Sequence, residues 1–432
     1  MLIIIGFILV AILMYVLVKG KMTPIAAFIL LPTIAAFCAG YPASEVGGFI
    51  KSGISSMTTT ACLFAFSISY FSIMSDIGLF DPLLRVLTRR GSQNVFFVLL
   101  CVLAATFVAH LDGSGATTFL VVVPAFLPIC KKIGIRPEAL LCTICGTYAV
   151  NNLLPWGGPT MRAASVLGIE TGALYRYIIP SLVIILALAV LLAYIVSRIE
   201  IKNGAGKNIA ADDGSVQTGG EVIEAKVSRP LYWFNVVLTA AVLVSLFTEI
   251  FPTHICFMLG TALALVVNFP QTKEQSARIK SYAAQAMVMT MTLFSVGVFL
   301  GIMKDGGFID AMASWLISLI PTSMAAHAHW FLALLSVPLI MMLSTDAFYY
   351  VLLPIVLGVV QPYGADPTSV AATFLITATF GTAISPGVAA VYVGLGLADV
   401  DIGTHIKYSF RLLWPLSILC LILSTVVGVV HF

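Results

Sequence analysis

Long apolar stretches, separated by short polar segments, follow one another along most of the chain. A helix needs about 20 apolar residues to cross the roughly 30 Å hydrocarbon core of a membrane. Ten stretches of this kind predict ten crossings, at residues 2–18, 22–44, 52–75, 139–161, 177–197, 230–248, 255–272, 281–303, 368–398 and 412–430. The pattern therefore predicts an all-α polytopic membrane protein.

Two further apolar regions, 94–130 and 328–361, are each about two helices long and carry polar residues near their middle. The interruptions lie at 110–115 in the first region and at 344–346 in the second. Non-helical backbone at membrane depth is tolerated only where protein or a water-filled cavity receives its polar groups. We therefore predict two re-entrant hairpins, each of which enters and leaves on one side.

Two of the long stretches are themselves broken by proline and glycine. The helix predicted at 137–168 is interrupted at 151–159, and the one predicted at 368–397 is interrupted at 381–387. Proline removes a backbone donor and clashes with the preceding turn, whereas glycine permits a reversal of the chain. We expect two broken helices with exposed backbone ends.

The chain contains an internal repeat. Residues 74–81 (MSDIGLFD) match residues 303–310 (MKDGGFID), so the offset is 303 minus 74, or 229. Three prolines recur at offsets of 230 or 231, with Pro124, Pro137 and Pro155 matching Pro354, Pro367 and Pro386. We therefore predict two repeats, residues 1–197 and 230–432, joined by a polar cytoplasmic linker at 198–229.

Each predicted repeat has five crossings and one hairpin, and because five is odd the second repeat must be inverted relative to the first. The basic residues support this topology. With the amino terminus outside, 18 of the 22 lysines and arginines fall on the cytoplasmic side, as the positive-inside rule requires. The first hairpin then enters from the cytoplasm and the second from outside.

The composition excludes several function classes. The chain is 60% hydrophobic and only 9% charged, and its mean hydropathy is +1.06. Because soluble domains carry about a quarter charged residues, a secreted protein, a nucleic-acid binder and an ordinary cytosolic enzyme are all excluded. The bilayer is the expected surrounding.

Acidic residues lie at both hairpin tips. In transporters with inverted repeats, the substrate lies near the midplane, between the ends of discontinuous helices. A buried carboxylate favours its neutral form unless a cation joins it, so Asp112 and Asp346 are candidate proton carriers or ligands for Mg²⁺ or Ca²⁺. The alternative is that each caps a half-helix. His110 is a candidate to share the proton, although a lone histidine beside an apolar run is more often simply packed.

Arg162 is the only guanidinium predicted near membrane depth, where it costs about 2.5–3.5 kcal/mol. Its fork suits a carboxylate, and the alternative is an arginine that reaches the outer interface. The other candidate substrate-binding residues carry neutral hydrogen-bonding groups or expose backbone at the four interruptions. They are Ser114, Thr117, Thr118, Asn151, Asn152, Gly157, Gly158, Ser344, Thr345, Thr382 and Ser385. Any one of the polar side chains could be a helix cap, so the hypothesis depends on the cluster.

Several of these motifs resemble those of the CitMHS family of citrate–metal complex:proton symporters. The resemblance runs over nearly the whole chain, and its motifs are Leu111-Asp112-Gly113, Pro155-Trp156-Gly157-Gly158-Pro159-Thr160, Asp346-Ala347 and Ile384-Ser385-Pro386. It implies proton-driven import of citrate, or a related tricarboxylate, as a complex with Mg²⁺ or Ca²⁺ across a bacterial cytoplasmic (inner) membrane, with no resident cofactor. Ser114 departs from the family, which more often has a second aspartate there.

Two other functions remain open from the sequence. One is a proton- or sodium-coupled transporter of another organic anion on the same fold. The other is an intramembrane aspartyl-type enzyme, which is disfavoured because no Gly-x-Gly-Asp motif occurs. By analogy with other folds that have paired hairpins, we expect an elevator-type mechanism, with the hairpins sliding against a homodimeric scaffold built from 2–44 and 230–272.

Overall fold

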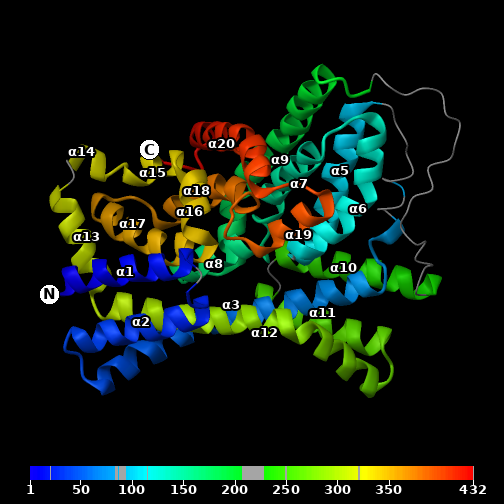
Figure 1. Cartoon of the computed structure of the whole chain (residues 1–432). Coiled ribbons are helices and arrows are strands. Elements are labelled where there is room, and N and C mark those ends of the chain that lie inside the picture. Colours follow the sequence, from blue (N-terminus) through cyan, green and yellow to red (C-terminus); the bar gives the residue numbers. More distant parts are fainter. Residues whose placement is uncertain are drawn as a thin grey trace, which may run out of the picture.

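The computed structural model shows a helical chain (Figure 1). It describes residues 1–19, 21–82, 86, 94–113, 115–206, 228–248, 251–319 and 322–431, and no strand occurs among them. Within these ranges, six helices are long and apolar enough to cross a membrane, and six apolar helices of 10–17 residues accompany them. The all-α class is therefore confirmed, whereas the ten crossings, the inverted topology and the re-entrant hairpins stay predictions.

The first half of the chain contains one very long helix, α3, and two helices separated by a short tip. Its elements are α1 (Leu2–Val18), α2 (Pro24–Cys38), α3 (Ala43–Asp76), α5 (Val95–Ala109), the 3₁₀ turn η1 (His110–Asp112), α6 (Gly115–Ile133), α7 (Pro137–Asn151), α8 (Gly158–Leu167) and α9 (Thr171–Lys202). Because α9 extends to Lys202, the predicted linker begins inside a helix. Residues 207–227 of that linker lie outside the described ranges.

The second half also contains a helix of 34 residues, α12. Its elements are α10 (Arg229–Thr248), α11 (Thr253–Asn268), α12 (Thr272–Asp305), α13 (Phe308–Leu319), α14 (Thr322–Ala325), α15 (Ala328–Leu334), α16 (Ser336–Ala347), η2 (Phe348–Leu352), α17 (Leu353–Val360), η3 (Gln361–Tyr363), α18 (Pro367–Thr382), α19 (Ala389–Ala398) and α20 (Ile402–Val426). Helix α13 was not among the predicted elements, and α20 begins ten residues before the predicted stretch. An Asp401 cap, whose side chain accepts a bond from the Thr404 N–H, starts α20 there.

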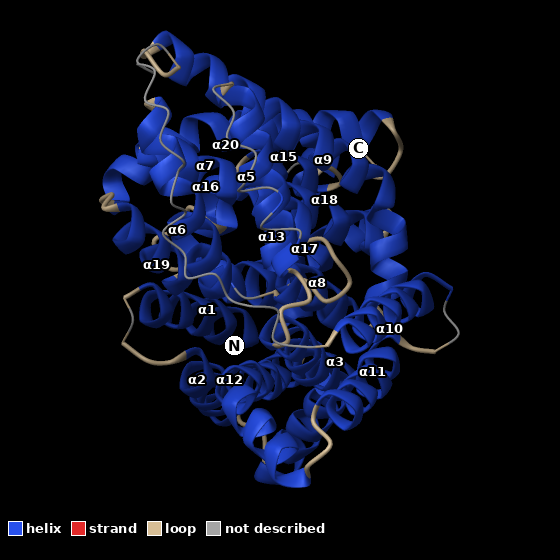
Figure 2. Ribbon diagram, turned by 90° about the vertical axis from the view of Figure 1, so that its right-hand side faces the viewer, coloured by secondary structure: helices blue, strands red, loops and turns tan. Residues whose placement is uncertain are grey.

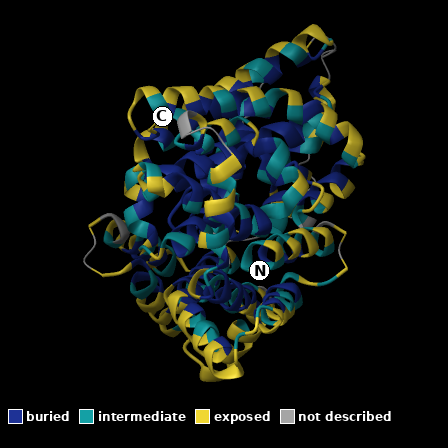
Figure 3. Ribbon diagram, turned by 90° about the vertical axis from the view of Figure 1, so that its left-hand side faces the viewer, coloured by how far each residue is buried: buried dark blue, intermediate teal, exposed yellow. Residues whose placement is uncertain are grey.

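The helices form two layers, which Figures 1 and 2 show from two directions. The scaffold layer consists of α1–α3 and α10–α12. The hairpin layer consists of α5–α9 and α15–α20, and Figure 3 shows its buried residues gathered at the centre of the molecule. The interrupted helices therefore lie inside the hairpin layer.

The scaffold layer is built on a close crossing of α3 and α12. A Cβ atom added to Gly53 would lie 1.9 Å from the Gly297 carbonyl oxygen, and one added to Gly301 would lie 2.1 Å from the Phe49 carbonyl oxygen. Small residues at such a crossing let two backbones approach closely, and the resulting van der Waals contact is one of the forces that associate helices in a membrane. The two longest helices are thereby held in direct backbone contact.

The hairpin layer is joined at one end by a buried glutamate. Glu200, near the end of α9, is fully buried and accepts a 2.7 Å bond from the Arg136 guanidinium at the start of α7. The Tyr408 hydroxyl of α20 donates to the same carboxylate at 3.0 Å. Because a buried charge must be paired, this cluster fixes α7, α9 and α20 relative to one another.

Candidate functional site

Two buried helices in the hairpin layer stop halfway, side by side. The chain leaves α7 at Asn151 and resumes helix in α8, and it leaves α18 at Thr382 and resumes helix in α19. The Thr379 hydroxyl donates to the Ala149 carbonyl at 3.3 Å, which joins the two helices one turn before they end. The two breaks therefore lie next to each other, as the sequence hypothesis requires.

The tip of the first hairpin lies against the first break. The Trp156 indole N–H donates to the Leu111 carbonyl at 2.8 Å, and a Cβ on Gly113 would lie 3.9 Å from the Trp156 carbonyl oxygen. The Tyr148 hydroxyl donates to the Gly115 carbonyl at 2.6 Å. Trp156 also packs at 5.2 Å between ring centroids against Phe71 of α3, so its role here is to hold the tip in place.

The tip of the second hairpin is a strained serine. Ser344 interrupts α16 with φ 68° and ψ 160°, a conformation that essentially only glycine adopts without cost. The Ser385 hydroxyl in the second break donates to the Met341 carbonyl at 3.4 Å, and a Cβ on Gly387 would lie 3.8 Å from the Ser344 Cβ. The second tip therefore lies against the second break, as the first tip does against the first.

Arg162 and Asp346 meet across the two halves. The Arg162 Nε donates to the Asp346 Oδ1 at 2.8 Å, and the two side chains are only 11% and 18% exposed. A Cβ on Gly158 would lie 2.7 Å from an Arg162 guanidinium nitrogen, so glycine leaves room for this cation beside the start of α8. Adding the predicted repeat offset of 231 to position 162 gives position 393, which is a valine. The second half therefore has no arginine that corresponds to Arg162.

The helices beyond the breaks cross over to the opposite hairpin. Helix α8 lies against η2, whereas α19 lies against α6. A Cβ on Gly115 would lie 2.9 Å from the Ala390 Cβ, and one on Gly394 would lie 2.5 Å from the Phe119 ring. The site is therefore assembled from both halves of the chain.

His110 is packed and hydrogen-bonded at the first tip. Its Nδ1 lies 2.8 Å from the Thr118 hydroxyl, and its ring lies 4.0 Å from the Tyr148 ring centroid. Thr117 and Thr118 are in the first turn of α6. The side chain of Asp112 and the whole of Ser114 lie outside the described residues, so their predicted roles remain predictions.

Four buried polar atoms near the breaks and the second tip find no hydrogen-bond partner in the described part of the chain. They are the Asn151 Oδ1, the Asn152 Nδ2, the Tyr349 hydroxyl and the Thr382 hydroxyl. Leaving such an atom unpaired costs about 1–3 kcal/mol. The set contains both donors and an acceptor, and it suits a ligand with several oxygens better than an apolar one.

Two candidates of the sequence prediction, Gly157 and Ser385, make close contacts with the backbone of their own break. A Cβ on Gly157 would lie 2.4 Å from the Asn152 carbonyl oxygen, so this residue must be glycine for the chain to turn. The Ser385 hydroxyl accepts from the Gly387 N–H at 3.2 Å. Thr345 is partly exposed beside Ser344 in the second tip. Tyr148 carries no sequence signal of its contact with the tip, because no pattern separates it from an ordinary buried aromatic residue.

A resident metal centre is not evident among the described residues, where no group of three or more His, Cys, Asp or Glu side chains lies close enough to hold an ion. Asp346, a candidate metal ligand, is instead paired with Arg162. A divalent cation bound here would therefore have to bring ligands of its own. A cation chelated by a polycarboxylate meets this requirement.

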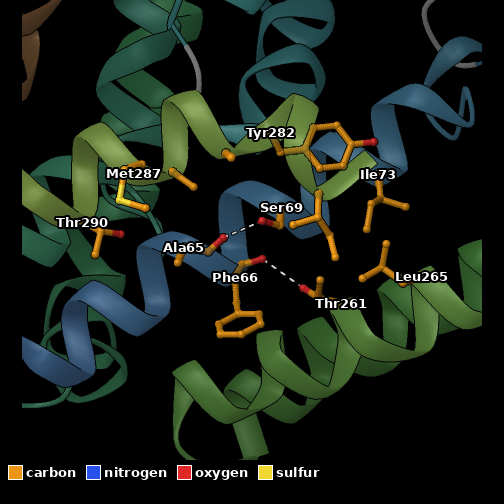
Figure 4. Close-up of a pocket in the computed structure, with 12 residues that line it drawn as sticks. Ala65, Phe66, Ser69, Ile73, Thr261, Leu265, Tyr282, Met287 and Thr290 are labelled. Carbon is orange, nitrogen blue, oxygen red and sulfur yellow. Dashed lines mark hydrogen bonds between the residues drawn. The ribbon is translucent and has the colours of Figure 1, made fainter. Parts of the chain in front are cut away.

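A cavity of about 440 Å³ lies elsewhere, between α3, α11 and α12 of the scaffold layer. Figure 4 shows its lining, where the Thr261 hydroxyl donates to the Phe66 carbonyl at 3.1 Å and Tyr282 and Met287 border the space. None of its lining side chains is charged. It does not suit a polyanion, and the candidate site remains at the breaks.

Comparisons with known proteins place the chain in a family of transporters. The sequence matches the citrate transporter family, CitMHS, over residues 1–381. It is 31% identical over 433 residues to the citrate transporter of Bacillus subtilis strain 168, with 100% of each chain covered. It is also 31% identical over 430 residues to the Mg²⁺/citrate complex secondary transporter of that organism, covering 99% of this chain and 98% of the other.

Among solved structures, MtrF of Neisseria gonorrhoeae, described as one of a class of antimetabolite efflux pumps, has a TM-score of 0.65 over 93% and 94% of the two chains. At 14% identity, that likeness is one of fold.

Proposed function

The chain belongs to the citrate transporter family, CitMHS, and on this premise we propose that it imports citrate, or a related tricarboxylate, as a complex with Mg²⁺ or Ca²⁺ and in symport with protons. It is a multi-pass membrane transporter and not an enzyme. The observation that carries the proposal is the Arg162–Asp346 pair, which joins the helix after the first break to the tip of the second hairpin. A guanidinium at this depth is the natural partner of a carboxylate.

Substrate binding follows from the groups around this pair. One carboxylate of the substrate takes the Arg162 guanidinium, and others accept hydrogen bonds from the unpartnered Asn152 amide and Thr382 hydroxyl. The Asn151 Oδ1 is free to accept a bond from a substrate hydroxyl. The start of α8 adds the partial positive charge of a helix N-terminus.

Proton coupling follows from competition for Arg162. When a substrate carboxylate takes the guanidinium, Asp346 loses its counter-charge in a site of low dielectric, where a lone carboxylate favours its protonated form. Asp346 would take that proton from the outer solution and release it on the inner side, when the substrate leaves and the ion pair forms again. His110 and Asp112 at the first tip are the further proton-carrying candidates.

The metal would travel as part of the substrate. A Bacillus subtilis relative is a Mg²⁺/citrate complex secondary transporter, which supports a chelated cation as cargo. Asp112 and Asp346 are the candidate protein contacts of that metal, since carboxylate oxygens are the ligands that Mg²⁺ and Ca²⁺ prefer. For Asp346 this is the alternative to proton uptake, because only the charged carboxylate would face the cation. A site that offers an arginine and carboxylates together suits a ligand carrying both charges.

The two layers suggest how the site changes sides. We propose that the hairpin layer moves against the scaffold layer, in a homodimer held through scaffold helices in a bacterial inner membrane. The support is the separation of the layers and the position of all four interruptions in one of them (Figure 1). The predicted inverted repeat fits this motion, because two mirrored halves would provide two related end states.

Uptake of radiolabelled citrate into proteoliposomes tests the proposal. Purified protein should accumulate citrate when Mg²⁺ or Ca²⁺ is present and the outside is more acidic, and a Na⁺ gradient alone should not drive uptake. Arg162→Gln should abolish uptake, whereas Arg198→Gln, which removes an exposed guanidinium near the end of α9, should not. Citrate uptake driven by a Na⁺ gradient would refute the proposed proton coupling. Selective uptake of another organic anion would refute the proposed substrate.

A further inference from the structure

A polar cavity lies between the two layers, away from the helix breaks. It has a volume of about 200 Å³ and is lined by α3, the end of α8 and the starts of α9 and α11. A neighbouring cavity of about 340 Å³ shares Ser56, Ser165 and Gly168 with it. The Ser165 hydroxyl donates to the Arg162 carbonyl at 2.8 Å. Ser165, which lines both cavities, is therefore one helical turn from Arg162 along α8.

Two helix N-termini meet at this cavity. Thr171 begins α9 and Thr253 begins α11, and neither helix has a side-chain cap. A Cβ on Gly172 would lie 3.3 Å from the Thr253 hydroxyl, so the two ends are adjacent. The first N–H groups of a helix have no partner within it, and with the helix dipole they favour an anion.

Unpartnered side-chain atoms give a second, independent indication of a ligand. The Thr171 hydroxyl has no hydrogen-bond partner among the described residues, although the residue is only 4% exposed, and the buried Nδ1 of His254 is also without one. Both residues line the cavity, and the hydroxyls of Ser56, Thr59 and Thr60 lie around it. Leaving a buried polar atom without a hydrogen bond costs free energy. We therefore expect a ligand to pair with these atoms.

The negative charge of Glu170 in the lining limits which class of ligand the cavity can bind. Glu170 also borders the cavity, and its carboxylate disfavours a bare polyanion. A metal–carboxylate chelate satisfies both sides, because its cation can face Glu170 and His254 while its carboxylates face the two helix ends. Neither a free divalent cation nor a free anion uses the whole lining.

We propose that this cavity is an external docking site for the divalent metal–hydroxycarboxylate chelate, occupied before the chelate reaches Arg162. The inference rests on the proposed function for the identity of the ligand. The distribution of basic residues assigns the cavity to the outer face. Lys202 lies at the opposite end of α9, and Lys273, at the start of α12, follows the opposite end of α11. Binding here concentrates the chelate at the boundary between the layers.

The kinetic test compares the two directions of transport. Thr171→Val, which keeps the side-chain shape, and Glu170→Gln should each raise the KM for Mg²⁺–citrate offered from outside by about tenfold, the loss expected for one hydrogen bond to a charged group. The maximal rate, and the KM measured from the inner side, should stay within about twofold of the unmodified protein because the central site is intact. Thr58→Val is the matched control, since Thr58 lies on α3 next to Thr59 and bonds only its own helix, at Ile54.

A labelling test reads the same site without transport. In a background with Cys38 and Cys62 replaced by serine, the cysteines that are not fully buried, Thr59→Cys should react with a membrane-impermeant maleimide from outside. External Mg²⁺–citrate should slow this reaction, whereas Mg²⁺ alone or citrate alone should slow it less. Lys51→Cys, exposed two turns earlier on α3, should react at the same rate in every case.

The outcomes separate the two proposals. Protection of Thr59→Cys in a protein that moves no citrate would support the docking site and refute the proposed function. Active citrate uptake, with no protection and an unchanged external KM in Thr171→Val and Glu170→Gln, would overturn the docking site alone. Equal protection by citrate with and without Mg²⁺ would overturn the chelate as its ligand.

Discussion

The substitution Asp346→Asn tests the competition for Arg162 through the sign of its effect. Asparagine keeps the shape of the side chain and removes the negative charge that pairs with the guanidinium at 2.8 Å. A substrate carboxylate would then find Arg162 without a charged competitor. We therefore expect Asp346→Asn to bind Mg²⁺–citrate more tightly than the unmodified protein does.

The size of the effect follows from the geometry of the pair. A hydrogen bond between charged groups contributes about 1.5–3 kcal/mol, and at side-chain exposures of 11% and 18% solvent screening removes little of it. Since about 1.4 kcal/mol is a factor of ten, the Kd should fall by about ten- to a hundredfold. Uptake driven by a pH gradient should nevertheless be lost, because asparagine carries no titratable proton.

Calorimetric titration of purified protein with Mg²⁺–citrate at pH 7 measures the first effect, and proteoliposome uptake measures the second. Arg162→Gln serves as the opposite case, in which binding should weaken. Asp399→Asn is the matched control, since Asp399 is exposed at the end of α19 and asparagine also tolerates its left-handed backbone (φ 55°). It should bind and transport normally.

Three results would contradict the proposal that Asp346 competes with the substrate for Arg162 or carries the coupled proton. If Asp346→Asn weakens binding as much as Arg162→Gln does, the carboxylate helps to hold the substrate instead of competing with it. A loss seen with Mg²⁺–citrate but not with citrate alone would place Asp346 against the metal. Proton-driven uptake at the normal rate by Asp346→Asn would remove this acid from the coupling altogether.

Three further substitutions test other parts of the structure. Thr382→Val should leave the thermal unfolding midpoint nearly unchanged, because its hydroxyl has no partner to lose, while the Kd for citrate rises about tenfold. Gly53→Ala should lower the yield of folded protein in size-exclusion chromatography, since its Cβ would meet the Gly297 carbonyl, whereas Gly47→Ala, which meets nothing within 4 Å, should not. Glu200→Gln should reduce the free energy of unfolding by about 1–3 kcal/mol in a denaturant titration, less than a fully buried pair loses because the Arg136 side chain is 40% exposed. Equal behaviour of the two glycine variants, or an unchanged stability of Glu200→Gln, would contradict these expectations.

The sequence predicted where the helices are interrupted but not how long each helix is. Proline, glycine and polar residues mark the tips and breaks locally, and the structure has interruptions at all four places. By contrast, α3 and α12 each span 34 residues, although only 24 and 23 were predicted from 52–75 and 281–303. A hydropathy pattern marks only the apolar part of a helix, whose length matches the thickness of the bilayer. It does not show that polar residues at either end extend the same helix beyond the bilayer.

The pairing inside the site was beyond sequence reasoning. Apolar flanks place Arg162 and Asp346 at membrane depth, but they do not say which way either side chain points. The two residues are 184 positions apart, and their contact depends on α8 crossing to the opposite hairpin. The unpartnered atoms of Asn152 and Thr382 were equally hidden, because satisfaction of a polar group is a property of the packed structure.

The crossing of α8 to the second hairpin has a consequence for biosynthesis. Arg162 enters the bilayer with the first half of the nascent chain, and its counter-ion follows 184 residues later. At about 5–20 residues per second, the ribosome delivers that carboxylate roughly 10–40 s after the arginine. During this interval the insertion machinery, or water drawn into the unfinished half, must stabilise the positive charge. The partly inserted first half is therefore the intermediate on which we expect membrane-protein quality control to act.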